Sequence, residues 1–230
     1  MKVSICIPTY EMSGIGVKVL SRLIDSIKEQ TYNDYEIIVS DHSINNDIKE
    51  YCESKDIIYL RCEIERGNPA TNTNNAIKKA TGELIKIMNQ DDFFYHKNSL
   101  ERMVNQLVES NSKWVITACI HCNEDETRFY HHHVPYYPEN DIRLIEGINT
   151  IGCPSVVMFV NDNNFFDNKV LFEIDCELFY MLNKKYGKPS VIKDALVCIR
   201  QGDKNLTVTM GNNDILLKND VKYIKEKYNL

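Results

Sequence analysis

Short apolar runs alternate with amphipathic stretches along the first half of the chain. The apolar runs have the length of buried strands, and they cover residues 3–7, 35–40, 57–62, 84–88 and 113–119. Between them, apolar residues recur at helical spacing, as at Leu20, Leu23 and Ile27. The stretches between the strands predict helices over residues 17–30, 46–55, 69–80 and 98–110. Strands and helices that alternate in this way form βαβ units, so the sequence predicts an α/β fold with a mostly parallel sheet.

The pattern changes after about residue 123. Residues 123–154 are polar and aromatic and predict mostly loops. Two further strands are predicted at 155–160 and 195–200, and two further helices at 175–186 and 214–228. No linker rich in Gly, Pro or Ser divides the chain, so we expect a single domain over residues 1–230.

The composition is that of an ordinary soluble globular protein, with 43% hydrophobic and 26% charged residues. No apolar run reaches the ~18 residues that span a bilayer, and the N-terminus lacks the features of an export signal. The net charge of −6 argues against nonspecific binding of nucleic acid, which depends on Lys and Arg. Several of the eight cysteines lie inside apolar runs, as buried reduced thiols do. These features predict a cytoplasmic protein that has no nucleic-acid partner.

Two adjacent acids, Asp91 and Asp92, lie in the loop that begins where the predicted strand at 84–88 ends. In an open α/β sheet, ligands bind in the crevice beyond the carboxyl ends of the strands. Because two adjacent carboxylates repel each other, a site that keeps both ionised usually supplies a cation. Mg²⁺ or Mn²⁺ fits, since these metals take oxygen ligands and bridge to phosphates. The alternative is a solvated turn in which an Asp caps the following helix.

Three segments occur together in one order: VSICIPTY at 3–10, EIIVSDHSINND at 36–47 and GELIKIMNQDDFF at 82–94. In this combination the chain resembles the family 2 glycosyltransferases of bacterial surface-glycan synthesis, which are inverting enzymes with a GT-A fold. The resemblance implies a mostly parallel central sheet flanked by helices, with a smaller acceptor-side region. Residues 1–122 would then bind a nucleotide-sugar, and residues 123–230 would bind the acceptor and supply the catalytic base.

The resemblance also implies which residues hold the nucleotide. Pro8, Thr9 and Tyr10 match the loop after the first strand, which forms part of the nucleotide pocket in the family. Asp41 matches the acid that contacts the base, commonly uracil. The acids after the fourth strand form the DxD motif of the family, which binds the ribose and a metal, and Asp91 matches its second, metal-ligating acid.

Two positions depart from the family pattern. Asn89 stands where the DxD motif has its first acid, so Asn89, Asp91 and Asp92 together are the expected metal ligands. Asn74 matches the Asn of a motif that contacts the diphosphate, but Thr73 replaces the Arg of that motif. We consider two arginines, Arg66 and Arg200, as substitutes for the missing contact; each could equally be a surface charge.

The base is expected at the start of the helix predicted from residue 175. Asp175 is the best match to the catalytic acid that family members place there, and Glu173 is the second candidate. In the alternative interpretation Asp175 caps the helix and Glu177 simply occupies its first turn. A positioned carboxylate would take the proton of the attacking hydroxyl.

The segment GCPSVVMF at 152–159 resembles the acceptor-side strand of the family. Gly152, Pro154 and Ser155 would then border the sugar pocket, although a core strand after a turn is equally consistent. The segment 200–207 could form a loop near the diphosphate.

Other chemistry is less consistent with the sequence. Cys119 and Cys122 form a CxxC, and three histidines follow at 131–133, but the second CxxC or spaced His pair of most zinc sites is missing. These histidines could instead line an acceptor pocket or belong to a partly exposed hairpin. The chain has no GxxxxGK[ST] and no GxSxG, and Gly14-Ile-Gly16 does not extend to GxGxxG. P-loop NTPases and α/β-hydrolases are thereby excluded, and a Rossmann oxidoreductase is disfavoured.

The sequence therefore predicts a glycosyltransferase that depends on a divalent metal, Mn²⁺ or Mg²⁺, and inverts the transferred sugar. The expected partners are a nucleotide-sugar donor, UDP-linked by family analogy, and a glycan or lipid-linked oligosaccharide acceptor. A noncatalytic nucleotide- or glycan-binding module, favoured by Asn89 and Thr73, and a sugar nucleotidyltransferase are the alternatives. The helix at 214–228 could make peripheral membrane contact or pack on the domain; the sequence predicts no oligomeric state.

Overall fold

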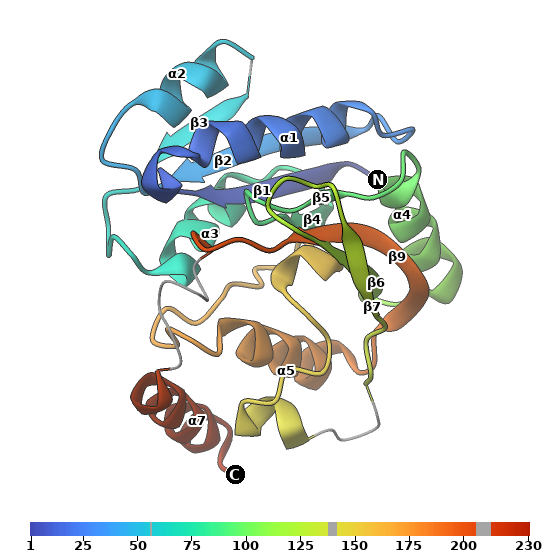
Figure 1. The fold of residues 1–230 in the computed structure, drawn as a ribbon. Helices are drawn as coiled ribbons and strands as arrows, with labels where there is room; N and C mark the ends of the chain where they lie inside the picture. Colours follow the sequence, from blue (N-terminus) through green and yellow to red (C-terminus); the bar gives the residue numbers. More distant parts are fainter. Residues whose placement is uncertain (56, 138–141, 206–212) are drawn as a thin grey trace.

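One twisted sheet runs through the computed structural model, which describes residues 1–55, 57–137, 142–205 and 213–230 (Figure 1). In this described part the sheet has nine strands in the order β3-β2-β1-β4-β8-β6-β9-β5, and β7 pairs with β6 beside this path. The α/β class is confirmed, and most of the paired positions belong to parallel strands.

The N-terminal half of the sheet is entirely parallel. Its strands are β1 (Val3–Thr9), β2 (Tyr35–Asp41), β3 (Ile58–Arg61) and β4 (Leu84–Ile87). They are connected by α1 (Gly16–Lys28), α2 (Asp47–Glu53) and α3 (Pro69–Lys79), with the short turn η1 (Met12–Gly14) before α1. The strand order steps outward through β2 and β3 and then returns to β4, so right-handed crossovers place α1 and α2 on one face and α3 on the other (Figure 1).

The second half mixes strand directions. β8 (Val157–Val160) lies antiparallel between β4 and β6 (Trp114–Cys122), whereas β9 (Ser190–Arg200) runs parallel to β6. β5 (Phe93–Phe94) and β7 (Phe129–His133) add short antiparallel pairs. The predicted strand at 155–160 begins later than expected, because residues 154–156 form the turn η3 (Pro154–Val156). The remaining elements are α4 (Ser99–Ser110), η2 (Ile142–Glu146), α5 (Ile174–Tyr186) and α7 (Asp214–Tyr228).

A lysine is fully buried in the centre of the sheet. Lys86 on β4 is 0% exposed, and its Nζ donates to the carbonyl oxygens of Ile87 at 3.1 Å, of Val157 at 3.4 Å and of Ser155. Burial lowers the pKa of this amine to about 7. Because two of its acceptors belong to η3 and β8, Lys86 ties the turn before β8 to the end of β4, beside the two acids.

The terminal helix α7 packs on the domain, one of the two alternatives that the sequence left open. Its own residues Asp220 and Ile224 are buried against the rest of the domain. At its C-terminal end, Lys227 Nζ lies 2.7 Å from carboxylate oxygens of Asp167 and Glu177, and Tyr228 donates to Glu177 at 2.6 Å. Among the described residues, no helix combines the length and apolarity that crossing a membrane requires.

Candidate active site

A cavity of about 970 Å³ opens beyond the carboxyl ends of β1 and β4 and extends to the start of α5. Its volume is within the range of small-molecule sites. Segments far apart in the chain line it, including residues 8–12, 89–92, 152–154 and 173–175. The predicted loop residues Pro8, Thr9 and Tyr10 are therefore brought together with the predicted metal and base residues in one cavity.

Side-chain amides hold the strand ends in place. Gln90, which is buried, donates from Nε2 to the Tyr10 carbonyl at 3.0 Å and accepts from the Tyr10 amide at 2.7 Å. Asn72 on α3 donates to the Thr9 carbonyl at 3.0 Å and accepts from the Ser40 hydroxyl at 2.7 Å. The end of β1 and the loop after it are thus fixed to the loop after β4 and, through α3, to β2, which gives the cavity a preformed wall.

The two adjacent acids have different surroundings. Asp92 is 3% exposed, and its Oδ2 accepts from the Ser155 hydroxyl at 2.6 Å while its Oδ1 accepts from the Arg200 amide at 3.3 Å. Ser155 in turn accepts from the Asn89 amide at 2.9 Å. Asp92 therefore joins the ends of β4 and β9 to the turn η3, with both carboxylate oxygens engaged by the protein.

Asp91 is the acid left open to the cavity. The residue is partly buried, its carboxylate interacts with its own backbone amide, and the nearby charge of Arg200 partly offsets the effect of desolvation on its pKa. Desolvation raises the pKa of Asp91 and, more strongly, that of Asp92, where the neighbouring Asp91 charge adds to the effect. A cation in the cavity would therefore stabilise the ionised form of Asp91.

The oxygen donors at this end of the cavity fit a hard divalent metal. Asp91 offers a carboxylate and Asn89 an amide, and both line the cavity. In the part of the chain that the structure describes, no three His, Cys, Asp or Glu side chains converge as a ready-made metal site. The residues present therefore suit an ion such as Mg²⁺ or Mn²⁺, which takes one or two protein carboxylates and completes its shell with phosphates and waters.

Asp41 lies beneath the cavity and does not line it. It is 0% exposed. Its Oδ1 accepts from the Ser43 amide at 2.9 Å and the Ser43 hydroxyl at 2.6 Å, and its Oδ2 accepts from the Tyr59 hydroxyl at 2.9 Å. Arg61 approaches the same oxygen at 3.5 Å. The next residue, His42, lines the cavity in its place.

Two residues expected near the diphosphate have other contacts. The Asn74 side chain exchanges two hydrogen bonds of 2.8 Å with the backbone of Phe166 and does not line the cavity. The Arg200 guanidinium points to Glu124, donating to its carbonyl at 3.0 Å and pairing with its carboxylate at 3.2 Å. Arg66 does line the cavity. Residues 206 and 207 of the predicted loop lie outside the described residues.

Three acids surround the start of α5, and one of them is largely unengaged. Asp175 lines the cavity, where its Oδ2 lies 3.5 Å from the Asn149 amide nitrogen. Glu173 also lines the cavity, with 8% exposure. Glu177 is held internally by Lys227 and Tyr228. Desolvation and the neighbouring Glu173 charge raise the pKa of Asp175 to about 8.

The segment that carries Glu173 is held by α7. The Asp220 Oδ2 accepts from the backbone amides of Leu171 at 3.1 Å, Phe172 at 2.6 Å and Glu173 at 3.0 Å. These charge-assisted hydrogen bonds fix the chain just before α5. Sequence reasoning missed this role, because Asp220 lies 47 residues beyond Glu173 and belongs to an ordinary amphipathic helix.

Replacing Asp220 tests this contact. We expect Asp220→Ala to lower the free energy of unfolding by about 2 kcal/mol, because three amides lose a buried anionic acceptor. Asp220→Asn, which keeps an acceptor oxygen, should lose about half as much. The neighbouring exposed residue provides the control variant Asn219→Ala, and urea unfolding measures all three. Equal stability of the Asp220→Ala and Asn219→Ala proteins would contradict the assigned role.

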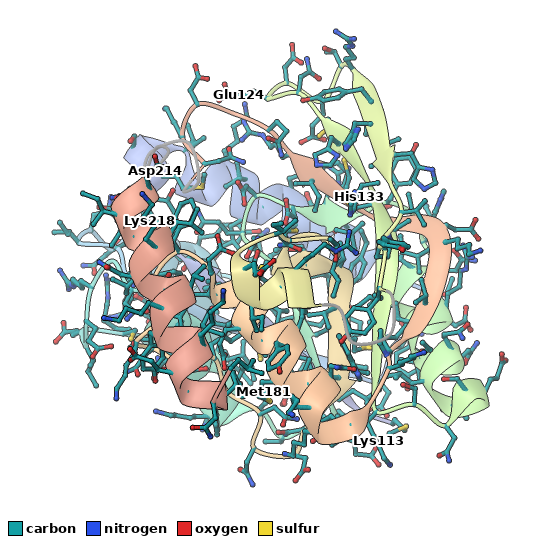
Figure 2. The ribbon with its side chains drawn as sticks, turned by 90° about the horizontal axis from the view of Figure 1, so that it is seen from below. Lys113, Glu124, His133, Met181, Asp214 and Lys218 are labelled. Atoms are coloured by element: carbon teal, nitrogen blue, oxygen red, sulfur yellow. The ribbon has the colours of Figure 1, made fainter. Side chains whose placement is uncertain are left out.

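Three histidines line the cavity on the side that lies away from α7. His121 on β6 and His131 and His133 on β7 line it, with ring centroids 5.0 Å apart for His121 and His131 and 6.2 Å apart for His131 and His133. Figure 2 shows His133 on β7, on the other side of the molecule from Asp214 and Lys218 of α7. A β-bulge in the pairing of β6 with β7 sets the positions of these histidines. Cys119 pairs with His133, whereas His121 pairs with Tyr130, and His131 has a φ of 53°.

Backbone carbonyls orient two of these rings. His121 Nδ1 lies 3.0 Å from the His131 carbonyl, and His133 Nε2 lies 3.1 Å from the Ile151 carbonyl. Burial, reinforced by the two other histidines, lowers the pKa of His121. The ring nitrogens that these carbonyls do not contact can form hydrogen bonds with a hydroxyl. All eight cysteines are free thiols, and the described residues contain no zinc-type cluster around Cys119 and Cys122.

Comparison with known proteins agrees with this geometry. The family model described as "Glycosyl transferase family 2" matches residues 4–172. Over 229 residues the chain is 25% identical to an "Uncharacterized glycosyltransferase" of Rickettsia felis, which covers 97% of this chain and 37% of that protein. The chain spans about a third of the length of the first curated relatives it matches.

Two solved structures have a similar fold. S. aureus TarS 1–349 in complex with UDP has a TM-score of 0.68 at 18% identity, over 88% of this chain and 61% of that chain. The mannosyltransferase PcManGT from Pyrobaculum calidifontis, in complex with GDP-Man and Mn²⁺, has a TM-score of 0.58 at 18% identity, over 86% and 56% of the two chains. The GT-A fold expected from the sequence is confirmed.

Proposed function

Because the chain belongs to glycosyl transferase family 2, we propose that its cavity binds a nucleotide-sugar and transfers the sugar, with inversion, to a hydroxyl group of an acceptor. The observation that carries this proposal is the placement of two open carboxylates in one cavity. Asp91 lies at the end of β4, and Asp175 lies at the start of α5. Neighbouring acids are engaged by the protein itself: Asp92 by Ser155 and Arg200, Glu177 by Lys227 and Tyr228, and the buried Glu173 by Cys176.

Asp175 is the proposed base. The acceptor hydroxyl attacks the anomeric carbon while the bond from that carbon to the diphosphate oxygen breaks, and Asp175 takes the hydroxyl proton. Attack from the face opposite the leaving group inverts the anomeric centre. The raised pKa suits this role, because a carboxylate with a pKa of about 8 is a stronger base than an ordinary Asp.

Asp91, with Asn89 beside it, would hold a divalent cation at the diphosphate end of the cavity. The ion would stabilise the negative charge that develops on the departing nucleoside diphosphate. The protein contributes the orientation, since Asp92, Ser155 and the buried Lys86 fix the turn on which these ligands lie.

The donor is proposed to be a UDP-sugar and the acceptor a glycan or a lipid-linked oligosaccharide. His121, His131 and His133 offer ring faces and ring nitrogens that can form hydrogen bonds with sugar hydroxyls on the acceptor side. A lipid-linked acceptor would bring the protein to a membrane surface. The open Asp175 favours a transferase over the noncatalytic binding module, which has no need of a base.

Calorimetric titration of UDP in the presence of Mn²⁺, and again with a chelator, tests the donor site. We expect binding that weakens strongly when the metal is removed, since the ion would join the diphosphate to Asp91. A GDP titration in parallel distinguishes the two nucleotides. A protein that binds neither nucleotide under either condition would contradict the proposed function.

The pH dependence of transfer tests the assigned base. Asp175 accepts a proton only when ionised, and its pKa is raised to about 8. We therefore expect kcat/KM to rise with pH between about 6 and 8 and to level off above 8. Steady-state kinetics in overlapping buffers at saturating Mn²⁺ measures the profile. A rate that is already constant from pH 5 upward would contradict a base with a raised pKa.

A further inference from the structure

Four rings form a row that leads from the surface of the molecule into the cavity. Tyr130 on β7 is 37% exposed and stacks on His121 of β6, with ring centroids 6.3 Å apart. His121 lies 5.0 Å from His131, and His131 lies 6.2 Å from His133. The three histidines line the cavity, whereas Tyr130 does not. This ring row, made of Tyr130, His121, His131 and His133, therefore continues the cavity wall onto the outer surface.

The inner end of the ring row lies close to the proposed base. His133 Nε2 lies 3.1 Å from the Ile151 carbonyl. The Asn149 side chain accepts from the backbone amides of Ile151 at 3.0 Å and Gly152 at 2.9 Å, and its amide nitrogen lies 3.5 Å from the Asp175 carboxylate. Two contacts, through Ile151 and Asn149, thus connect His133 to Asp175. A sugar that presents its hydroxyl to Asp175 can therefore continue into a chain that follows the row.

The outer part of the ring row lies on an open edge of the sheet. Within the described ranges, β7 pairs with β6 alone, and four of its five residues are exposed. The sequence of β7, FYHHH, has none of the Lys or Glu side chains that often protect an edge strand. The β-bulge at Cys119 and His121 interrupts the regular ladder, which disfavours the addition of another strand. The edge thus offers side-chain rings rather than backbone groups to a partner.

The chemistry of these rings suits an uncharged sugar chain. The face of an aromatic ring attracts C–H groups, because it is the negative part of the ring's quadrupole. A sugar with equatorial hydroxyls exposes C–H groups on its ring faces, and its hydroxyls can form hydrogen bonds with imidazole nitrogens. Burial and the two neighbouring histidines lower the pKa of His121, so this imidazole is uncharged at pH 7. The Arg128 guanidinium, 5.6 Å from the centre of the Tyr130 ring, adds donors for hydroxyls at the outer end.

We propose that the ring row is an extended binding surface for the acceptor, and that the acceptor is an uncharged oligosaccharide of several sugars. Its terminal sugar presents a hydroxyl to Asp175, and the sugars behind it lie along the histidines toward Tyr130. This inference rests on the proposed function and goes beyond it, since it names the class of acceptor and the direction in which its chain leaves the cavity. Binding then tightens as the acceptor lengthens, until the chain reaches Tyr130.

Calorimetric titration of oligosaccharides onto the protein, saturated with UDP and Mn²⁺, tests this surface without transfer taking place. The probes are β-1,4-linked glucose and N-acetylglucosamine series of one to five sugars, whose equatorial hydroxyls leave the C–H faces free. In at least one series we expect wild type to bind four sugars about tenfold more tightly than one. Tyr130→Ala should bind the four-sugar probe about fivefold more weakly than wild type and the single sugar equally well. Tyr130→Phe, which keeps the ring, should retain most of the affinity.

Phe129→Ala is the matched control. Phe129 is the neighbouring exposed aromatic residue of β7, but its ring packs on Tyr95, at 5.8 Å, rather than on the ring row. Its replacement should leave the affinity for every probe unchanged. An equal loss of four-sugar binding in Phe129→Ala and Tyr130→Ala would overturn the proposal.

The remaining outcomes separate this inference from the proposed function. Wild type that binds one and four sugars equally, or that binds UDP but none of the probes, would overturn the extended surface and leave the donor site intact. Failure to bind UDP as well would overturn the proposed function. A dimer in sedimentation that Tyr130→Ala dissociates would assign the surface to a second copy of the chain instead. Because the length series tests wild type directly, a variant that failed to fold would not prevent the decision.

Discussion

Asp175→Asn is expected to lower the rate of sugar transfer by about 10³-fold, the largest effect of any single replacement considered. A general base contributes about 10²- to 10⁴-fold to a rate, and an amide of the same shape cannot take the hydroxyl proton. Within the described part of the chain, hydrogen bonding by the Asp175 carboxylate is limited to a long contact with the Asn149 side chain, at 3.5 Å, so the replacement should leave the fold and the nucleotide affinity nearly unchanged. Steady-state kinetics together with a UDP titration measures the two quantities separately.

Glu173→Gln is the matched control for this prediction. Glu173 lines the same cavity, and it was the second candidate for the base on sequence grounds. We expect it to retain transfer within about tenfold, because its loss removes a neighbouring charge but not the proton acceptor. An inactive Glu173→Gln protein beside an active Asp175→Asn protein would assign the base to Glu173 instead.

Asp91→Asn should weaken Mn²⁺-dependent UDP binding by about 100-fold and reduce transfer accordingly. With Asn already at position 89, Asp91 is the charged ligand open to the cavity at the end of β4. Its replacement leaves two amides there, which bind hard divalent cations more weakly than a carboxylate does. UDP titration at a series of Mn²⁺ concentrations measures the change.

Asp92→Asn provides the contrast, because the protein itself uses both oxygens of Asp92. Its contacts with Ser155 and the Arg200 amide lie in the interior, so we expect a lower melting temperature and a smaller change in metal-dependent binding. An equal loss of Mn²⁺-dependent binding in both variants, at unchanged melting temperature, would make Asp92 a metal ligand like Asp91.

Local patterns in the sequence predict most of the strands and helices. The strands around Ile5, Ile38 and Ile85 and the helices between them are set by apolar periodicity, which acts within a few residues. The placement of Asp91 after β4 and of Asp175 at the start of α5 follows from the same local signals. The antiparallel insertion of β8 between β4 and β6 could not be deduced in this way, since a short apolar strand has no signal for direction.

The individual roles of polar residues depended on distant partners. Asp41 and Asp92 have the sequence context of ligand-binding acids, yet Tyr59 engages the first and Ser155 the second. In the sequence, Lys86 is a single charged residue inside an apolar strand. Two of its three carbonyl acceptors belong to η3 and β8, which lie beside β4 only in the folded structure. Contacts between residues far apart in the chain determine which carboxylate stays open to the cavity. A local sequence pattern does not encode such contacts.

Proton NMR of the transfer reaction determines whether the protein transfers a sugar and with which stereochemistry. The protein would be supplied with Mn²⁺, an α-linked UDP-sugar and a panel of glycan acceptors, and the anomeric signal of the product would be followed together with the release of UDP. We expect a β-linked product that appears in step with UDP, because a single displacement assisted by Asp175 inverts the anomeric carbon. An α-linked product would contradict this mechanism, and a protein that binds UDP but releases none from any donor would contradict its assignment as a transferase.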